Sequence, residues 1–245
     1  MSYANVNGLD IYYEVHGTGA PLVLLHGGLL TIDLTFGSML ATLAETRQVI
    51  AVELQGHGHT ADIERDFELA HLAGDVVGLL DHLGVEKADF FGFSLGGLVS
   101  LQVAMTYPER AGRLAVAGVH FRGDGYHPEV FAMDPNSRRL PTEAEFALLR
   151  DAYLAVAPEP EHFEAFMAKA SALPEKLDWS AEDLGSVRSP VLIVIGDTDF
   201  VRVDHAAEMH ALIPDARLAV LPDTTHMDLT RRPDHVLPLV TAFLG

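Results

Sequence analysis

Short apolar runs alternate with longer segments of helical periodicity along most of this chain of 245 residues. Residues 191–195 read VLIVI, a run with the length and the β-branched content of a buried strand. Residues 69–83 instead carry Leu, Ala and Val at spacings of three and four, which is typical of a helix with one apolar face. Strand and helix signals that alternate in this way favour a mostly parallel sheet with helices on both faces.

The same pattern predicts eight strands, the first two of which pair antiparallel around the turn dipeptide at Asn7 and Gly8. The expected fold class is therefore α/β, with an eight-stranded, mostly parallel sheet. The predicted strands are residues 3–6, 9–16, 22–25, 48–52, 88–91, 114–119, 191–195 and 217–221. The predicted helices between and after them are residues 69–83, 95–107, 203–213 and 233–243.

The alternation stops between residues 120 and 184. This stretch begins with Gly, Asp and Pro, continues with helical patterns at residues 142–156 and 161–173, and contains no strong strand signal. We therefore expect residues 1–119 and 185–245 to form the α/β core, and residues 120–184 to form a small helical cap.

Composition excludes several classes of protein. The chain has no cysteine, which removes disulfides, thiolate metal sites and a cysteine nucleophile. Its formal charge of −19 would repel a phosphate backbone, so we expect no nucleic-acid partner. The N-terminus does not read as a signal peptide, and every apolar run is far shorter than a membrane helix. We expect a cytoplasmic protein that contacts no membrane, and its oligomeric state stays open.

Residues 92–96 read GFSLG, which fits the pattern G-x-S-x-G. A predicted buried strand ends on this motif and a predicted helix begins after it. That context is typical of a nucleophile elbow, a sharp turn that exposes the serine oxygen above the sheet. We expect positions 92 and 96 to require glycine because the two backbones pass close to each other there. We also expect Ser94 to have a strained conformation.

With this motif in this order of strands, the chain resembles the α/β-hydrolase family over essentially its whole length. The resemblance implies that Ser94 is the nucleophile and that residues 24–29, which read LLHGGL, form an oxyanion loop. Backbone N–H groups of Leu95 and Gly28 would then stabilise the oxyanion, with Leu29 as the alternative to Gly28. We expect His26 to hold this loop by hydrogen bonding.

A serine nucleophile needs a base, and the chain has thirteen histidines. The family's order of serine, acid and histidine places the base at His226, after the last predicted strand. Residues 196–199 read GDTD and resemble the family's acid turn, in which the second aspartate, Asp199, orients the histidine. Asp197 is expected to shape the turn, and His235 to lie on the surface of the last helix.

His57 and His59 form an H-x-H pair, which can bind metal, but no third ligand is evident. We interpret residues 55–59 as a structural loop and expect neither a metal nor a cofactor.

Apolar side chains near the expected site favour a small ester or lactone substrate with a hydrophobic acyl part. Arg122, Arg138 and Arg139 are expected on the surface, although each could meet a polar group of the substrate. The predicted substrate-binding residues are Leu29, Phe93, Phe121, Trp179, Phe200 and Met227, and further candidates are Phe131, Met133, Phe163 and Met167.

These observations predict a serine carboxylesterase or lactonase that works through an acyl-enzyme. Because function depends on the site and not on the fold, four alternatives stay open. They are an acyl-homoserine lactonase, a carbon–carbon bond hydrolase, a lyase that uses the same three residues, and a non-catalytic ligand-binding member of the fold.

Overall fold

The computed structural model describes residues 2–245, except for the side chains of residues 174 and 175. Its strands form a single eight-stranded sheet in the order β1-β2-β4-β3-β5-β6-β7-β8, which confirms the predicted fold class. Strands β3 to β8 run parallel, whereas β2 is antiparallel to both β1 and β4. The strands are β1 (Ser2–Val6), β2 (Leu9–His16), β3 (Ala20–Leu25), β4 (Arg47–Val52), β5 (Ala88–Phe93), β6 (Ala111–Ala117), β7 (Val191–Thr198) and β8 (Ala216–Thr225).

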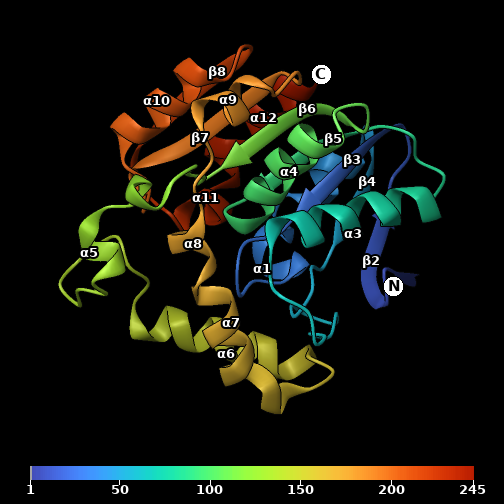
Figure 1. Ribbon diagram of the computed structural model, residues 1–245, viewed down its shortest axis with the longest axis horizontal. Coiled ribbons are helices and arrows are strands. Elements are labelled where there is room, and N and C mark those ends of the chain that lie inside the picture. The colour runs from blue at the N-terminus through green and yellow to red at the C-terminus, as the bar shows by residue number, and fades with distance from the viewer. Residues whose placement is uncertain (1) are drawn as a thin grey trace.

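Helices cover both faces of the sheet (Figure 1). Strand side chains alternate between two apolar cores: Val23 and Leu25 face one, while Leu22 and Leu24 face the other. This burial on both faces explains why the central strands are continuously apolar. The helices of the sheet domain are α1 (Ile32–Phe36), α2 (Leu40–Ala44), α3 (Leu69–His82), α4 (Leu95–Thr106), α10 (Val203–Leu212), α11 (Asp228–Arg231) and α12 (Pro233–Leu244).

The sequence analysis missed α1, α2 and α11. Each is only four or five residues long, which is too short to display a helical period.

Between β6 and β7 the described chain forms helices and no strand. We call residues 120–184 the cap segment, and its division from the core as a domain stays a prediction. Figure 1 shows α6 and α7 below the layers of the sheet and its helices. The elements here are η1 (Gly123–Gly125), α5 (Pro128–Phe131), α6 (Glu143–Val156), η2 (Pro160–His162), α7 (Phe163–Ser171), α8 (Leu173–Lys176) and α9 (Ala181–Gly185).

The helical patterns predicted at residues 142–156 and 161–173 correspond to α6 and α7, whereas α5, α8 and α9 were not predicted. Helix α6 begins at a capping box between Thr142 and Glu145. The boundary predicted at residue 184 falls inside α9, a helix that packs against α10 of the sheet domain.

Candidate active site

Ser94 lies between the end of β5 and the start of α4, with φ 49° and ψ −115°. A non-glycine residue with positive φ is strained, and such strain is concentrated at functional sites. A Cβ on Gly92 would lie 2.4 Å from the carbonyl carbon of Gly96, and one on Gly96 would lie 2.0 Å from the Leu25 oxygen. Glycine at both positions is therefore a steric requirement of this turn, as predicted.

His226 follows β8 and Asp199 follows β7, so both lie at the carboxyl edge of the sheet, where Ser94 also lies. The Nδ1 atom of His226 is 2.6 Å from Oδ1 of Asp199. Their side chains are 3% and 0% exposed. The Asp199 carboxylate also accepts hydrogen bonds from the backbone N–H groups of Gly196 and Val201 at 3.3 and 3.2 Å. The acid is thus held in one orientation, facing one nitrogen of the imidazole.

Packing fixes the plane of the imidazole. Phe200 stacks on the His226 ring at 4.1 Å between centroids, and Phe93 packs at 4.8 Å. A Cβ on Gly118 would lie 2.7 Å from Cε1 of His226, so the backbone of Gly118, with φ 64°, supports the ring directly. Both phenylalanines are predicted substrate residues, and in the structure they pack against the histidine.

The rivals considered for the base and the acid have other partners. Asp197 accepts a hydrogen bond from the backbone of Thr224 at 3.3 Å. Backbone N–H groups of Asp223 and Thr224 lower the pKa of its exposed carboxyl, as befits a residue that shapes the turn. His235 lies on α12 beside Asp234, away from the acid turn.

The loop after β3 is held by His26. Its Nδ1 lies 2.8 Å from the Gly27 oxygen, and its Nε2 accepts a hydrogen bond from the Leu54 N–H at 3.0 Å. Burial, with a contribution from His57, lowers the pKa of His26 to about 3, so the ring is neutral and Nε2 can accept. The predicted structural role of His26 is confirmed.

A small cavity of about 90 Å³ lies over the serine. Gly28, Ser94 and Leu95 line it together, whereas Leu29, which has a positive φ of 63°, is not among its lining residues. The other lining residues are Phe67, Leu98, Tyr126, Ala170 and Leu173. Most of the wall is apolar, and Ala170 and Leu173 come from the cap segment.

None of the six predicted substrate-binding residues lines this cavity. Phe121 is fully buried and stacks on His205 at 4.3 Å. Leu29 is half-buried against the core, and Met227 is buried against the opposite core cluster. Leu29, Phe121 and Met227 thus pack into the protein around the cavity, and which residues contact the substrate stays a prediction.

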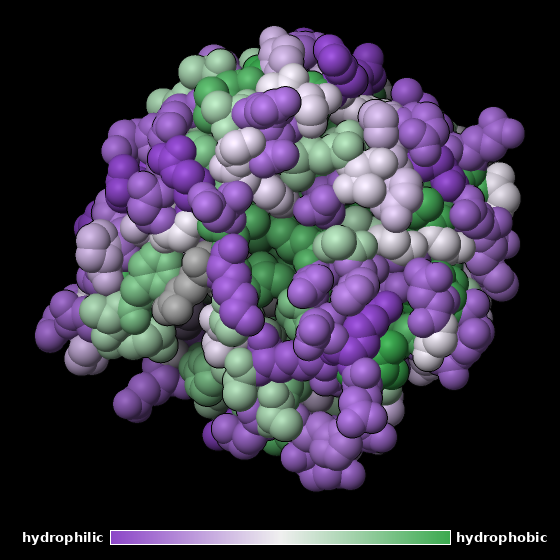
Figure 2. Space-filling model, in the orientation of Figure 1, coloured by the Kyte–Doolittle hydropathy of each residue, from purple (hydrophilic) through white to green (hydrophobic). Residues whose placement is uncertain are grey.

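Trp179 lines a neighbouring groove of about 350 Å³, which shares Phe67 and Leu173 with the cavity at Ser94. The groove runs between the start of α3, α4 and α8. On the face shown in Figure 2, apolar surface lies at the bottom of a central hollow that is bordered by hydrophilic side chains.

The other four candidates lie within the cap segment. Phe131 and Met133 are exposed, the latter by 69%, while Phe163 is buried and Met167 is partly buried. Phe163 packs against Tyr153 at 5.0 Å, so it belongs to the small core of the cap.

Two of the three arginines contact the acid turn. Arg138 donates to the Thr198 hydroxyl at 2.9 Å, and Arg139 donates to the Asp199 carbonyl at 2.8 Å while pairing with Glu129. The third, Arg122, pairs with Glu208 at 3.0 Å on the surface. The cap segment thus holds the backbone beside the acid, a role that the sequence analysis did not predict.

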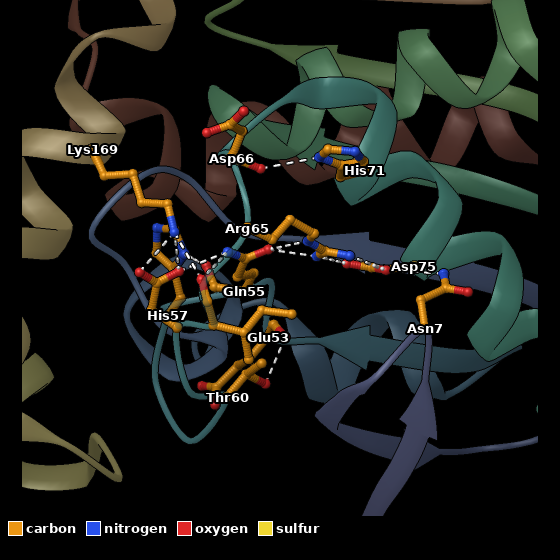
Figure 3. A network of polar contacts seen from close by, with 12 residues as sticks. Asn7, Glu53, Gln55, His57, Thr60, Arg65, Asp66, His71, Asp75 and Lys169 are labelled. Atoms are coloured by element: carbon orange, nitrogen blue, oxygen red, sulfur yellow. Dashed lines mark hydrogen bonds and ion pairs between the residues drawn. The ribbon is translucent and has the colours of Figure 1, made fainter.

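A polar network joins the cap to the loop after β4 (Figure 3). Lys169 on α7 lies 3.0 Å from both carboxylate oxygens of Asp62. Gln55 donates to the same carboxylate at 2.6 Å and accepts from Arg65 at 2.8 Å. Arg65 continues the network to Asp75 on α3.

The H-x-H pair contributes to the same loop. His57 bonds the Gln55 carbonyl through Nδ1 at 2.9 Å, and His59 pairs with the buried Glu53 at 2.8 Å. Among the described residues, which are 2–245 except for the side chains of 174 and 175, no three His, Asp or Glu side chains form a potential metal site. None of the described helices is long and apolar enough to cross a bilayer.

Tyr126 is a site residue that the sequence analysis missed. It lines the serine cavity, where it is the only polar side chain among the described residues besides that of Ser94 itself. It lies in a stretch rich in Gly and Pro at residues 123–128, which predicts a turn. Nothing in that pattern distinguishes this tyrosine from one on the surface.

Comparison with known proteins gives a family match. Residues 20–140 match the model described as alpha/beta hydrolase fold. The chain is 32% identical, over 95% of its length, to the dihydrolipoyllysine-residue acetyltransferase component of the acetoin cleaving system of Pseudomonas putida, and it spans 66% of that protein. It is 27% identical, over 100% of its length and 98% of the relative, to an Azorhizobium caulinodans protein named as the carbamate hydrolase RutD.

Among solved structures, one described as Est816, an N-acyl homoserine lactone degrading enzyme, superposes with a TM-score of 0.81. It is 25% identical, with 98% of this chain and 99% of that chain covered. The fold and the names of these relatives support a hydrolase. The family match, the sheet order and the similar structures together show that this chain belongs to the α/β-hydrolase fold family.

Proposed function

We propose that this protein is a serine hydrolase that cleaves carboxylic esters or lactones through an acyl-enzyme. One observation carries the proposal: the buried pair of His226 and Asp199, 2.6 Å apart, lies at the same sheet edge as the strained Ser94. A serine hydroxyl is a weak nucleophile, and an oriented imidazole is the group that activates it.

In the proposed mechanism, His226 takes the proton of Ser94 as the hydroxyl attacks the carbonyl carbon. The backbone N–H groups of Gly28 and Leu95, which line the same cavity as Ser94, stabilise the oxyanion. The alcohol leaves with the proton from His226, and water then hydrolyses the acyl-enzyme with the same residues in reversed roles. Asp199 holds the imidazole tautomer and stabilises its charged form.

The apolar wall of the cavity favours substrates with an uncharged acyl or alcohol group. Similarity to a structure described as an N-acyl homoserine lactone degrading enzyme favours lactones among the substrates to be tested. Because the cavity is only about 90 Å³, small acyl groups should react before long ones unless the cap segment moves.

The test is hydrolysis of p-nitrophenyl esters of increasing chain length, followed by lactones, with the parent and Ser94→Ala. The parent should turn over, and the variant should lose activity by about 10⁴-fold or more. Ser171→Ala, which changes an exposed serine of α7, is the matched control and should keep full activity. A Ser94→Ala protein as active as the parent would overturn the proposal.

If the parent hydrolyses neither esters nor lactones, carbon–carbon substrates are the next arm of the test. Labelling of Ser94 by an organophosphonate, which reacts with activated serines, would then separate a hydrolase of another substrate class from a ligand-binding protein.

A further inference from the structure

The mechanism proposed for Ser94 gives no task to the hydroxyl of Tyr126, although Tyr126 is the only other polar side chain that the structure describes in the cavity wall. Tyr126 lines the cavity together with Ser94, Gly28 and Leu95. The cavity is only about 90 Å³, so the side chains of Tyr126 and Ser94 border the same small space. From this wall a phenol can reach Oγ of Ser94, the atom that forms and breaks the covalent bond to the acyl group.

The position of Tyr126 is fixed from the side of the acid turn. Its backbone forms an antiparallel bridge with Val201, and the next residue, His127, donates to the Phe200 carbonyl at 2.9 Å. Its ring packs at 4.1 Å against His120 and at 5.9 Å against Phe200. Two backbone contacts and two ring contacts therefore hold the phenol over the serine.

The phenol keeps its proton. Burial raises the pKa of Tyr126, and the nearby charge of Asp199 raises it further. Ser94 has a single hydroxyl proton, which it must direct toward His226 in the proposed mechanism. Its oxygen can then only accept from Tyr126, so Tyr126 is the donor.

We propose that Tyr126 is a catalytic residue that donates a hydrogen bond to Oγ of Ser94 and acts chiefly in breakdown of the acyl-enzyme. The inference rests on the proposed acyl-enzyme function. In the resting enzyme the same hydrogen bond already stabilises the serine hydroxyl, so it lowers the barrier to the first step little. The ester oxygen of the acyl-enzyme is a poor acceptor, so the bond gains strength chiefly when Oγ leaves with an electron pair.

Deacylation uses water as its only co-reactant. Water adds to the acyl carbon and gives a proton to His226. The bond from that carbon to Oγ of Ser94 then breaks, its electron pair moves to Oγ, and Oγ takes the proton from His226. Tyr126 transfers no proton; its hydrogen bond reduces the charge that develops on Oγ before the proton arrives.

The experiment is rapid mixing of parent and Tyr126→Phe with p-nitrophenyl acetate, because the burst reports acylation and the following linear phase reports deacylation. The substitution keeps the ring and removes only the hydroxyl. We expect a burst of about one p-nitrophenol per active site with a rate within about twofold of the parent. The linear phase should be slower by roughly 10- to 100-fold, the value of one hydrogen bond to a charged oxygen.

Tyr153→Phe is the matched control, because Tyr153 is a buried tyrosine of α6 whose ring packs against Phe163 and Phe166 in the cap. It should leave both phases unchanged. The rate of phosphonate labelling, which requires only attack by Ser94, should be the same in parent and Tyr126→Phe.

Two results would overturn the role of Tyr126. One is an unchanged linear phase in Tyr126→Phe. The other is an equal loss in burst, linear phase and labelling together with a lower unfolding temperature, which is the signature of a purely structural residue. A parent that neither turns over nor labels rejects the acyl-enzyme itself. An active parent with an inert Ser94→Ala supports the acyl-enzyme, so that any failure in Tyr126→Phe then concerns the role of Tyr126 alone.

Discussion

The two walls of the candidate site are built by different kinds of contact. On the elbow side, main chain approaches main chain, and the space for a Cβ on Gly92 or Gly96 is already filled by backbone atoms. On the cap side, single side chains hold the acid turn and the nearby loops: Arg139 bonds the Asp199 carbonyl, and Lys169 pairs with Asp62.

This difference determines how each wall responds to change. A steric clash between backbones cannot be relieved by a rotamer, so a substitution at the elbow should disturb the whole turn. A partly exposed hydrogen bond or ion pair contributes at most about 1 kcal/mol, so the cap side should lose its contacts one by one. Substitutions on each wall test this difference.

The largest effect is expected at Asp199, where the two walls meet. Asp199→Asn would present an amide to Nδ1 of His226 and favour the wrong tautomer, so kcat should fall by about 10⁴-fold. Asp197→Asn is the matched control, because its exposed carboxylate bonds only backbone and a neighbouring hydroxyl of the turn. Steady-state kinetics that found Asp197→Asn the more damaged would move the acid to residue 197.

Gly96→Ala tests the elbow wall. The added Cβ would lie 2.0 Å from the Leu25 oxygen, so we expect a loss of more than about 3 kcal/mol in unfolding free energy, or failure to fold. Gly74→Ala on α3 is the control, since its Cβ would meet only the Tyr107 hydroxyl at 3.7 Å. That variant should equal or exceed the parent by up to about 1 kcal/mol. Equal denaturant midpoints for both variants would remove the steric argument.

Acid should destabilise the protein through two buried histidines, His26 in the loop after β3 and His57 in the loop after β4, whose ring centroids are 4.7 Å apart. Burial lowers the pKa of His26 to about 3 and that of His57 to about 4, from an ordinary value of 6.5. The unfolded chain therefore binds more protons than the folded one between about pH 6.5 and pH 4. Stability is fully present above that window and falls as the pH drops through it, by up to about 1.4 kcal/mol per pH unit for each histidine.

The variant His57→Gln should reduce the slope of unfolding free energy against pH by the contribution of one proton. Urea unfolding at a series of pH values measures this slope. His71→Gln, which changes an exposed residue of α3, should keep the slope of the parent. If His57→Gln shows the parent slope, His57 is not among the groups that make the protein sensitive to acid.

The smallest effect is expected at the cap. Lys169→Met would break the pair with Asp62 and the bond to the Ile63 carbonyl, at a cost of about 1 kcal/mol or less because the pair is partly exposed. Hydrogen exchange should show faster opening of α7 and little change in the central strands. Arg150→Met, which breaks an exposed pair with Asp151, should change neither. Equal acceleration in the strands would mean that cap and core open together.

Much of the fold was predictable because it depends on local pattern. A strand buried on both faces must be continuously apolar, which is why residues 22–25 and 191–195 were identified as buried strands. The serine turn was predictable for a similar reason, since only glycine fits where β5 meets α4. The family's chain order then selected His226 and Asp199 from many histidines and aspartates, and the structure brings these two within 2.6 Å.

The lining of the cavity was not predictable in this way. Phe93 and Phe200 are adjacent in sequence to site residues, yet they pack against the His226 ring, while Phe67, Ala170 and Leu173 reach the serine from distant segments. Apolar residues in a core and in a pocket have the same composition, so sequence cannot separate them.

The sequence alone therefore determined the sheet, the glycine-lined turn and the order of the candidate catalytic residues, because each follows from backbone sterics, apolar periodicity or the family's chain order. Only the tertiary structure decided what surrounds them. Tyr126 lines the same cavity as Ser94, and Arg139 bonds the Asp199 carbonyl across 60 residues, because residues 120–184 pack against the carboxyl edge of the sheet. Contacts of that kind depend on how segments far apart in the chain pack together, and no local pattern in the sequence records it.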